Sequence, residues 1–342
     1  MDNVWESRPG AGFEGDAWEQ AQEVIDMSEA RGFKASLLGG VRESAFGVSP
    51  GAIDATALPI VSSGIKASRN TINTSVLRGR RDPAKPFRGN VDVAGDVVVP
   101  VDRIAIGYWL QMLLGDPTTT GTSTYTHTFK VGDSQPSWVL EHAYDDVGVY
   151  LRYNGCKAST FKIDVGGDGE LTATFGVMGA GEIIGSSSMD SSPSVLSYNV
   201  FNQFDAAIQE GGATSAIITN ASISINNNLD GSIYVIGGGG KRARLPEGMI
   251  EVTGSVKALF DDSTLLTKAT NGTESALSIT FTSGSYSLNF LIQELMLEQS
   301  SPGISTPGGL FVELNFTGYY EDGAAGSSFQ ATLVNNHAAY AA

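Results

Sequence analysis

Short runs of alternating apolar and polar residues, separated by glycine, recur along the whole chain. The clearest run is GNVDVAGDVVVPVD at residues 89–102. A period of two places successive side chains on opposite faces of a strand. The chain has 42 glycines among its 342 residues, and glycines between such runs mark turns. The sequence therefore predicts a mainly β protein, long enough for two domains or for one large β domain.

Three segments have helical rather than strand periodicity. An N-terminal helix is expected over about residues 17–30, a second within RIAIGYWLQMLLGD (103–116), and a short third within DDSTLLTKATNG (261–272). Asp261 and Asp262 are expected to cap the third helix, because carboxylates accept bonds from the free N–H groups of a first turn. The segment from residue 33 to 59 is rich in Gly, Ser and Pro and is expected to run extended over other surfaces.

The two halves of the sequence contain a weak internal repeat. Residues 89–102 align with residues 248–261 at a constant offset of 159, and five of these fourteen positions are identical. Each copy follows a basic loop and precedes a helix. We therefore predict two tandem β domains, although one β domain that repeats a common strand pattern would give the same alignment. The predicted boundaries are an N-terminal arm with a helix at 1–45, a first domain at 46–184, a linker at 185–198, a second domain at 199–324 and a C-terminal tail at 325–342.

The formal net charge of −16 argues against a protein that holds nucleic acid. Tight binding to DNA comes from Lys and Arg side chains that displace its counterions. An acidic surface could still serve a protein that lets DNA pass without adhering. Basic residues nevertheless gather ahead of the two aligned strands. They are Arg78, Arg80, Arg81, Lys85 and Arg88 before the first strand, and Lys241, Arg242 and Arg244 before the second.

No pattern in the sequence predicts a catalytic, cofactor-binding or metal site. GVSPG at residues 47–51 has the spacing of a nucleophile elbow, but Pro50 lacks the N–H that would stabilise an oxyanion. GGGGK at 237–241 lacks the first glycine and the final Ser or Thr of a phosphate loop. The single cysteine, Cys156, is expected to be an apolar filler of the core. The acidic N-terminal sequence and the absence of an 18-residue apolar run predict neither a secretory signal nor a membrane anchor.

Residues 58–129 resemble the tail tube (major tail) proteins of long-tailed, siphovirus-type bacteriophages. The shared features are a strand with Lys-x-Ser-Arg-Asn, an Arg-rich loop, a Gly-x-Val-x-Val-x-Gly strand and a Tyr-Trp-Leu helix that closes on Leu-Leu-Gly-Asp. The likeness continues through YLRYNGCKAS, LTATFGVMGAGE, TNASISINNN and RLPEGMIEVTGSVKALFDD. It covers about residues 45–320.

The resemblance implies two tandem tail-tube-type domains, each a β-sandwich or half-barrel with one flanking helix. It implies a structural virion protein, not an enzyme, made in the host bacterial cytoplasm and located in the tail. Such proteins assemble into stacked rings that form a conduit for genome ejection. A chain with two tube domains would build a ring of three chains with pseudo-sixfold symmetry, and a six-chain ring is less favoured. The implied partners are other copies of the chain, the tail tip, terminator and tape measure proteins, and DNA passing through the lumen.

Within this interpretation, Arg78, Arg80, Arg81, Lys85 and Arg88 would form an inter-ring stacking loop, with Lys241, Arg242 and Arg244 as its second-domain equivalent. Solvated loop charges are the alternative. Asp92, Asp96, Glu251 and Ser255 share the polar side of the alternation, so they face either the lumen or the exterior.

A second class of function also fits the sequence. A β-sandwich binding module, either carbohydrate-binding or a virion decoration protein, could stack sugars on Trp18, Trp109 or Trp138. Trp109 lies in an apolar helix and fits a core position better.

Overall fold

The computed structural model describes residues 29–51, 53–215, 217–304 and 308–340. Within these residues the protein is mainly β, as the alternation predicts. Two of the expected helices are confirmed as α2 (Ala105–Leu114) and α3 (Thr264–Asn271). The N-terminal helix expected over residues 17–30 lies almost wholly outside the described residues.

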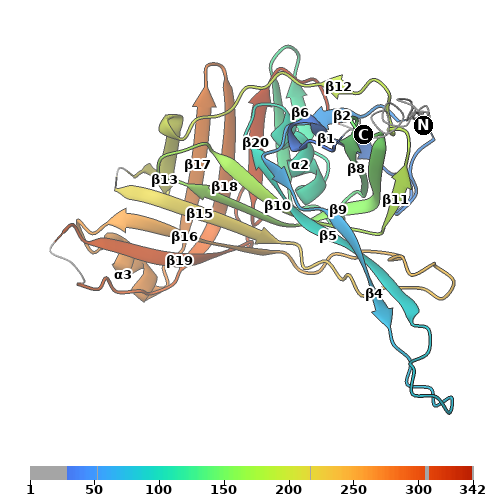
Figure 1. Ribbon diagram of the computed structural model, residues 1–342. Coiled ribbons are helices and arrows are strands. Elements are labelled where there is room, and N and C mark those ends of the chain that lie inside the picture. The colour runs from blue at the N-terminus through green and yellow to red at the C-terminus, as the bar shows by residue number, and fades with distance from the viewer. Residues whose placement is uncertain (1–28, 52, 216, 305–307, 341–342) are drawn as a thin grey trace, which may run out of the picture.

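Eight strands form one continuous antiparallel sheet, which we call the wall (Figure 1). Neighbouring strands pair along much of their length, and the buried side chains from β5 to β18 are mostly apolar. In spatial order the strands are β4 (Lys66–Ile72), β5 (Phe87–Pro100), β10 (Thr172–Gly179), β9 (Val149–Val165), β15 (Ile218–Asn226), β16 (Glu251–Leu259), β19 (Phe311–Tyr319) and β18 (Tyr286–Leu297).

The wall contains the same order of connections twice. In the first strand set, β4–β5–β10–β9, a helix follows the second strand along the chain, and the last two strands in space come later in the chain in reverse order. The second strand set, β15–β16–β19–β18, repeats this arrangement. The seam between the sets joins β9 to β15, with Ile163 opposite Ile223 and Phe161 opposite Ile225.

Shorter strands cover the inner face of the wall and enclose α2 (Figure 1). The first half of β9 leaves the wall and pairs with β8 and β11, which extend the cover of the first set. On the second set, β18 pairs with β17 and β20. The covering strands are β1 (Ala35–Arg42), β2 (Thr56–Leu58), β3 (Ser62–Ser63), β6 (Thr118–Gly121), β7 (Tyr125–Lys130), β8 (Trp138–Tyr144), β11 (Gly181–Gly185), β12 (Ser194–Val195), β13 (Ala206–Glu210), β14 (Ala213–Thr214), β17 (Ser275–Ser283) and β20 (Gln330–Asn335), with 3-10 turns η1 (Gly32–Lys34) and η2 (Gln203–Asp205).

One hydrophobic core spans both strand sets. Trp109 of α2 stacks on Phe175 of β10, with 5.3 Å between ring centroids. Phe161 of β9 lies 5.8 Å from Phe290 of β18, so the aromatic packing crosses the seam. Full burial of such side chains contributes about 1.5–3 kcal/mol each. The shared core explains why the two sets form one body.

The structure shows strands within the predicted N-terminal arm, linker and C-terminal tail. Residues 35–42 of the predicted N-terminal segment 1–45 form β1, which pairs with β8. Residues 330–335 of the predicted C-terminal tail form β20, which lies between β18 and β7. Residues 33–59 contain β1 and β2 rather than one extended cover. The predicted linker carries β12 and the buried Met189. The division into two domains stays a prediction, which the repeated strand order supports.

Candidate assembly surfaces

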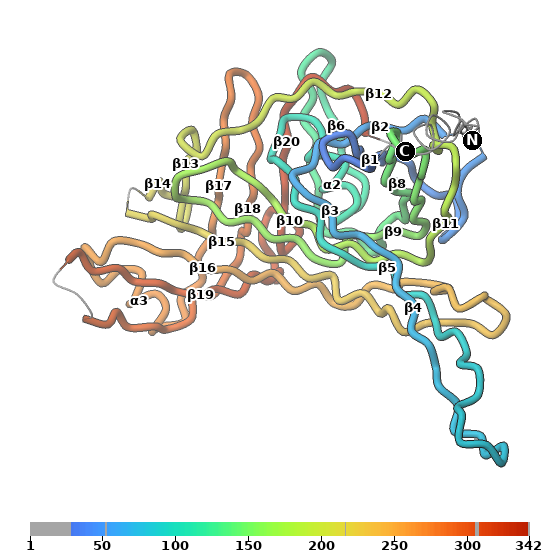
Figure 2. The backbone as a smooth tube through the Cα atoms, in the orientation of Figure 1, coloured from blue at the N-terminus to red at the C-terminus, as the bar shows by residue number. Residues whose placement is uncertain are grey.

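The end of β4 and the start of β5 project from the body and carry a long loop at their tip (Figures 1 and 2). We call residues 72–88 the arm. Pro83 and Pro86 cannot donate ladder bonds, and this ends the hairpin pairing. All five basic residues predicted for this loop are exposed: Arg78, Arg80, Arg81, Lys85 and Arg88.

The charges of the arm make few contacts within the chain. A guanidinium N–H of Arg78 donates to the carbonyl of Pro83 at 2.9 Å. Arg80 and Asp82 form an ion pair at 3.3 Å, in which both side chains are more than 70% exposed. An exposed pair of this kind contributes little to stability. The positive charge of the arm is therefore available to a partner.

Apolar side chains accompany this charge. Leu77 is 97% exposed, and Ile72, Val76 and Phe87 are each more than half exposed. Apolar side chains clustered on the surface mark protein–protein contact sites. The arm therefore combines exposed apolar and charged side chains, both of which occur in protein interfaces.

The second basic segment has a different environment from the arm. Arg242 is only 7% exposed and donates to the carbonyls of Gly231, Val93 and Gly179 at 2.8–3.0 Å. It also forms an ion pair with Asp92. Its burial assigns it to a contact within the chain, so only the exposed Lys241 and Arg244 remain for docking by this segment.

The four predicted lumen residues lie on one face of the wall. Asp96 is opposite Gly176, which is opposite Thr160, then Asn226 and finally Glu251, in one row across five strands. Directly opposite residues share a face of a sheet. Asp92 and Ser255 lie four residues along their strands from Asp96 and Glu251, so they are on the same face.

This polar face is rich in hydroxyl and amide groups and is weakly acidic. It carries five carboxylates and three lysines, and Lys162 pairs with Asp164 at 2.9 Å. At the arm end, Asp92 is held by Arg242, whereas Asp96 and Glu251 are exposed. The polar face comprises Lys66, Ser68, Asp92, Asp96, Thr160, Lys162, Asp164, Thr172, Thr174, Ser222, Ser224, Asn226, Glu251, Thr253, Ser255, Lys257, Glu313, Asn315 and Thr317.

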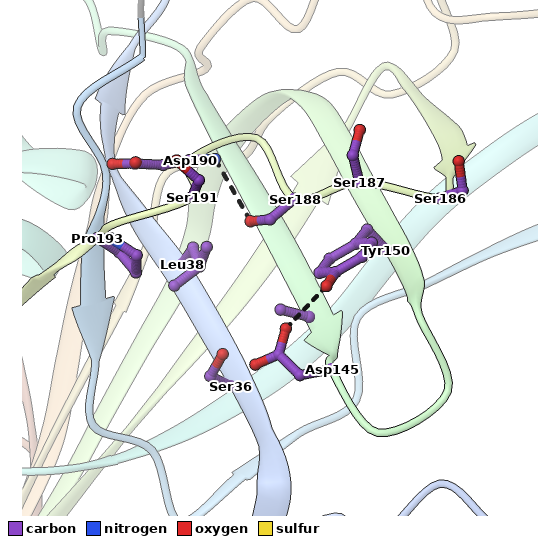
Figure 3. A pocket seen from close by; sticks show the side chains of 11 residues that line it. Ser36, Leu38, Asp145, Tyr150, Ser186, Ser187, Ser188, Asp190, Ser191 and Pro193 are labelled. Atoms are coloured by element: carbon purple, nitrogen blue, oxygen red, sulfur yellow. Dashed lines mark hydrogen bonds between the residues drawn. The ribbon is translucent and has the colours of Figure 1, made fainter. Parts of the chain in front are cut away.

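A serine-rich pocket of about 440 Å³ lies between β1, the β8–β9 turn and residues 186–193 (Figure 3). Tyr150 donates to Asp145 at 2.9 Å, and Ser188 donates to the buried Glu141 at 2.8 Å. The Ser188 bond fixes the crossing segment 186–193 on β8, and the Tyr150 bond joins β9 to the β8–β9 turn.

The structure also gives the surroundings of two tryptophans, of Cys156 and of Asp262. Trp109 and Trp138 are each 1% exposed, so neither can stack on a sugar, and Trp18 lies outside the described residues. Cys156 is buried, and burial raises the pKa of its thiol. Asp262 caps α3 as expected, accepting from the N–H of Thr264 at 2.8 Å. Among the described residues, no group of three or more His, Cys, Asp or Glu could hold a metal ion.

None of the helices in the described part of the chain is long and apolar enough to cross a bilayer. The wall, its polar face and the arm define a β-rich protein with exposed surfaces suited to assembly. The protein family described as "Phage tail tube protein" matches residues 34–318. Since this match covers most of the chain, the protein belongs to the phage tail tube protein family and is a component of the virion tail. No curated protein matches the chain.

Proposed function

We propose that three chains close into a ring, and that rings stack into a tail tube through which the phage genome is ejected. The observation that carries this proposal is the seam between β9 and β15. That seam joins two similar strand sets edge to edge inside one chain. A seam of the same kind between chains would close the wall into a barrel.

The two outer ends of the wall supply the edges for such a seam. Among the described residues, β4 pairs with β5 only, so its other edge is open. At the opposite end, β18 already pairs with β17, β20 and β19, so the stretch left for such a seam is residues 298–304, which follow β18 without forming a strand and include the 89% exposed Ile304. Open strand edges invite pairing, and closure into a ring removes them.

The internal repeat gives the register of the proposed seam. Ala67 pairs with Val93 of β5, and Ile225 pairs with Val252 of β16. Val93 and Val252 are matched positions of the repeat, so Ala67 takes the place of Ile225. Because Ile225 lies opposite Phe161 of β9, Ala67 would lie opposite the corresponding part of residues 298–304 in the next chain.

A ring of three chains would contain six strand sets and therefore have pseudo-sixfold symmetry. Each chain supplies eight wall strands, so the barrel would have 24, wide enough for an open lumen. A six-chain ring would need twelve sets and is less favoured. With the polar face toward the lumen, α2 and the covering strands would lie on the outside of the barrel.

The chemistry of the polar face suits a conduit for DNA. Phosphates are held mainly by Lys and Arg, and here three lysines lie among five carboxylates. The face would therefore repel DNA weakly and offer hydroxyl groups to its hydration water. Tape measure protein inside the tube and tail tip and terminator proteins at its ends are the proposed partners.

Purified full-length chain at increasing concentration tests the proposal. We expect native mass spectrometry to give a three-chain particle and negative-stain microscopy to show hollow tubes. Cryo-electron microscopy of the tubes would give the symmetry and the residues of the lumen. A chain that stays monomeric at all concentrations while folded by circular dichroism contradicts the proposal.

A further inference from the structure

We infer that the end of the wall opposite the arm carries a receiving surface, formed by residues 166–171 and 195–205, which binds the arm of a second copy. This inference rests on the proposed tube function and names the surface that the arm contacts. It follows from the position, packing and chemistry of these two segments.

The receiving surface and the arm lie at opposite ends of the same strands (Figures 1 and 2). β5 begins at the arm with Phe87 and ends at Pro100, and Pro100 pairs with Thr172. Residues 166–171 immediately precede Thr172 and form the β9–β10 turn. The two surfaces are therefore separated by the length of β5.

Hydrogen bonds join the two segments into one platform. The hydroxyl of Tyr198 donates to Glu170 at 2.9 Å. The Gln203 amide accepts from the N–H of Gly166 at 2.9 Å and donates to the carbonyl of Gly169 at 3.2 Å. Gly166 has a φ of 108°, a conformation that side chains other than glycine rarely adopt. The turn is thus held in a fixed position against residues 198–203.

The chemistry of the platform complements that of the arm. Phe204 is more than 80% exposed and Tyr198 is 57% exposed, so the platform presents apolar side chains to solvent. It also carries the exposed carboxylates of Asp168 and Asp205. Residues 166–171 and 195–205 contain no Lys or Arg, whereas the arm has five basic residues and one Asp. Complementary charge steers association and fixes register.

The opposite positions of the two surfaces determine the kind of assembly. A copy displaced along the strands brings its arm to the platform of its neighbour. Such a contact is heterologous, and repetition without closure gives an open filament. The same pair of surfaces can therefore add ring upon ring.

Charge exchange tests this inference. Asp168→Lys with Asp205→Lys should leave three-chain rings intact but raise the critical concentration for tube growth about tenfold or more, the equivalent of one lost charged contact pair. Arg80→Glu with Arg81→Glu should do the same. Rings that carry all four substitutions should recover tube growth, because the charges are again opposite. Asp54→Lys with Asp133→Lys is the matched control and should grow tubes normally.

Three results separate the two proposals. If the unsubstituted chain forms neither rings nor tubes, the proposed function fails. If it forms tubes and the receiving-surface variant grows them as well as the control does, the receiving surface is wrong and the tube remains. If both reversals stop growth but the fourfold variant does not recover, the direct pairing of these charges is overturned.

Disulfide trapping gives an independent measurement. Leu77→Cys with Phe204→Cys should form a ladder of linked chains on a non-reducing gel once tubes have grown. The native Cys156 is fully buried and should not react. Leu77→Cys with Ile184→Cys is the control, since Ile184 is 70% exposed but lies on β11, outside the platform. Tubes that give no ladder, or an equal ladder in the control, contradict the inference.

Discussion

The two strand sets of the wall share one order of pairing, but their helices have different surroundings. Every residue of α2 is buried, whereas only Leu265 and Ala269 of α3 are. The first set has an added hairpin, β6–β7, and β7 packs near α2 and pairs with β20. Tyr340 also reaches α2 and donates to the carbonyl of Ile104 at 3.0 Å. The comparison shows that strand alternation determines the order of the wall, while additional segments determine which helix becomes core.

The segments that precede β5 and β16 also differ in their surroundings. The arm projects from the body, whereas residues 227–250 lie along β5, where the carbonyl of Gly240 accepts from the N–H of Val91 at 2.7 Å (Figure 2). Both segments are basic. Composition alone therefore does not separate a docking charge from a structural one.

The largest expected difference in the free energy of unfolding is between the two helices. Leu110→Ala in α2 should lower it by about 3 kcal/mol, because the side chain is fully buried and leaves a cavity. Leu266→Ala in α3, where this side chain is half-buried, should lower the free energy of unfolding by less than about half as much. Urea unfolding of both variants measures the difference. Equal losses would show that α3 is as much a part of the core as α2.

The second difference is between buried and exposed arginines. Arg242→Ala should lower the free energy of unfolding by about 2 kcal/mol, because it leaves carbonyls and Asp92 without their donor. Arg244→Ala is the matched control and should stay within about 0.5 kcal/mol. Thermal melts of the two variants measure this contrast, and a stable Arg242→Ala protein would return that residue to the docking candidates.

A third comparison uses the carboxylates that precede the two helices. Burial raises the pKa of Asp102 to about 6. The folded protein therefore binds a proton that the unfolded chain has released, and stability falls as pH rises from about 4 to 6. Asp102→Asn should remove this fall, a change on the order of 2 kcal/mol across that range. Urea unfolding at several pH values compares the variant with the unsubstituted chain.

Asp262 should show the opposite pH dependence. The N–H of Thr264 lowers the pKa of Asp262, so the stabilisation by its carboxylate is present at neutral pH and is lost as pH falls through that lowered pKa. Asp262→Ala should therefore differ from the unsubstituted chain at pH 7 and approach it in acid. If the two substitutions changed the pH dependence of stability in the same direction, the contrast between a buried Asp102 and an exposed Asp262 would be wrong.

The smallest effect on unfolding is expected for the arm. Arg80→Glu, Arg81→Glu and Arg88→Glu together should change the free energy of unfolding by less than about 0.5 kcal/mol, since these side chains are exposed. The same variant should not form tubes. Replacement of the three by Lys keeps the charge and should preserve growth. Sedimentation and negative-stain microscopy measure growth, and normal tubes from the reversed variant would remove the arm from the stacking contact.

Much of the wall could be predicted from sequence because its information is local. The alternation in residues 89–102 and 251–259 specifies both a strand and its buried face, and Val93 and Val256 are buried as the pattern requires. The helices follow from their apolar residues and, for α3, from the cap at Asp262. The shared face of Asp92, Asp96, Glu251 and Ser255 could be predicted for the same reason.

The covering strands were harder to predict because their pairing is remote in sequence. β1 and β20 are short, and each has one partner about 100 or more residues away, β8 for the one and β7 for the other. The fate of Arg242 likewise depends on Val93 and Gly179, which no local pattern connects to it. The proposed receiving surface could not be predicted from sequence because its parts, Asp168 and Phe204, lie in separate turns.

The pairing of β20 with β7 has a consequence for synthesis of the chain. β7 is translated roughly 200 residues before β20, so the edge that pairs with β20 stays open until β20 has left the ribosome. Chains fold from the N-terminus as they emerge, and an exposed strand edge is prone to wrong pairing. Pairing of this edge of β7 therefore depends on synthesis of β20, and products truncated before β20 would keep an unpaired strand edge.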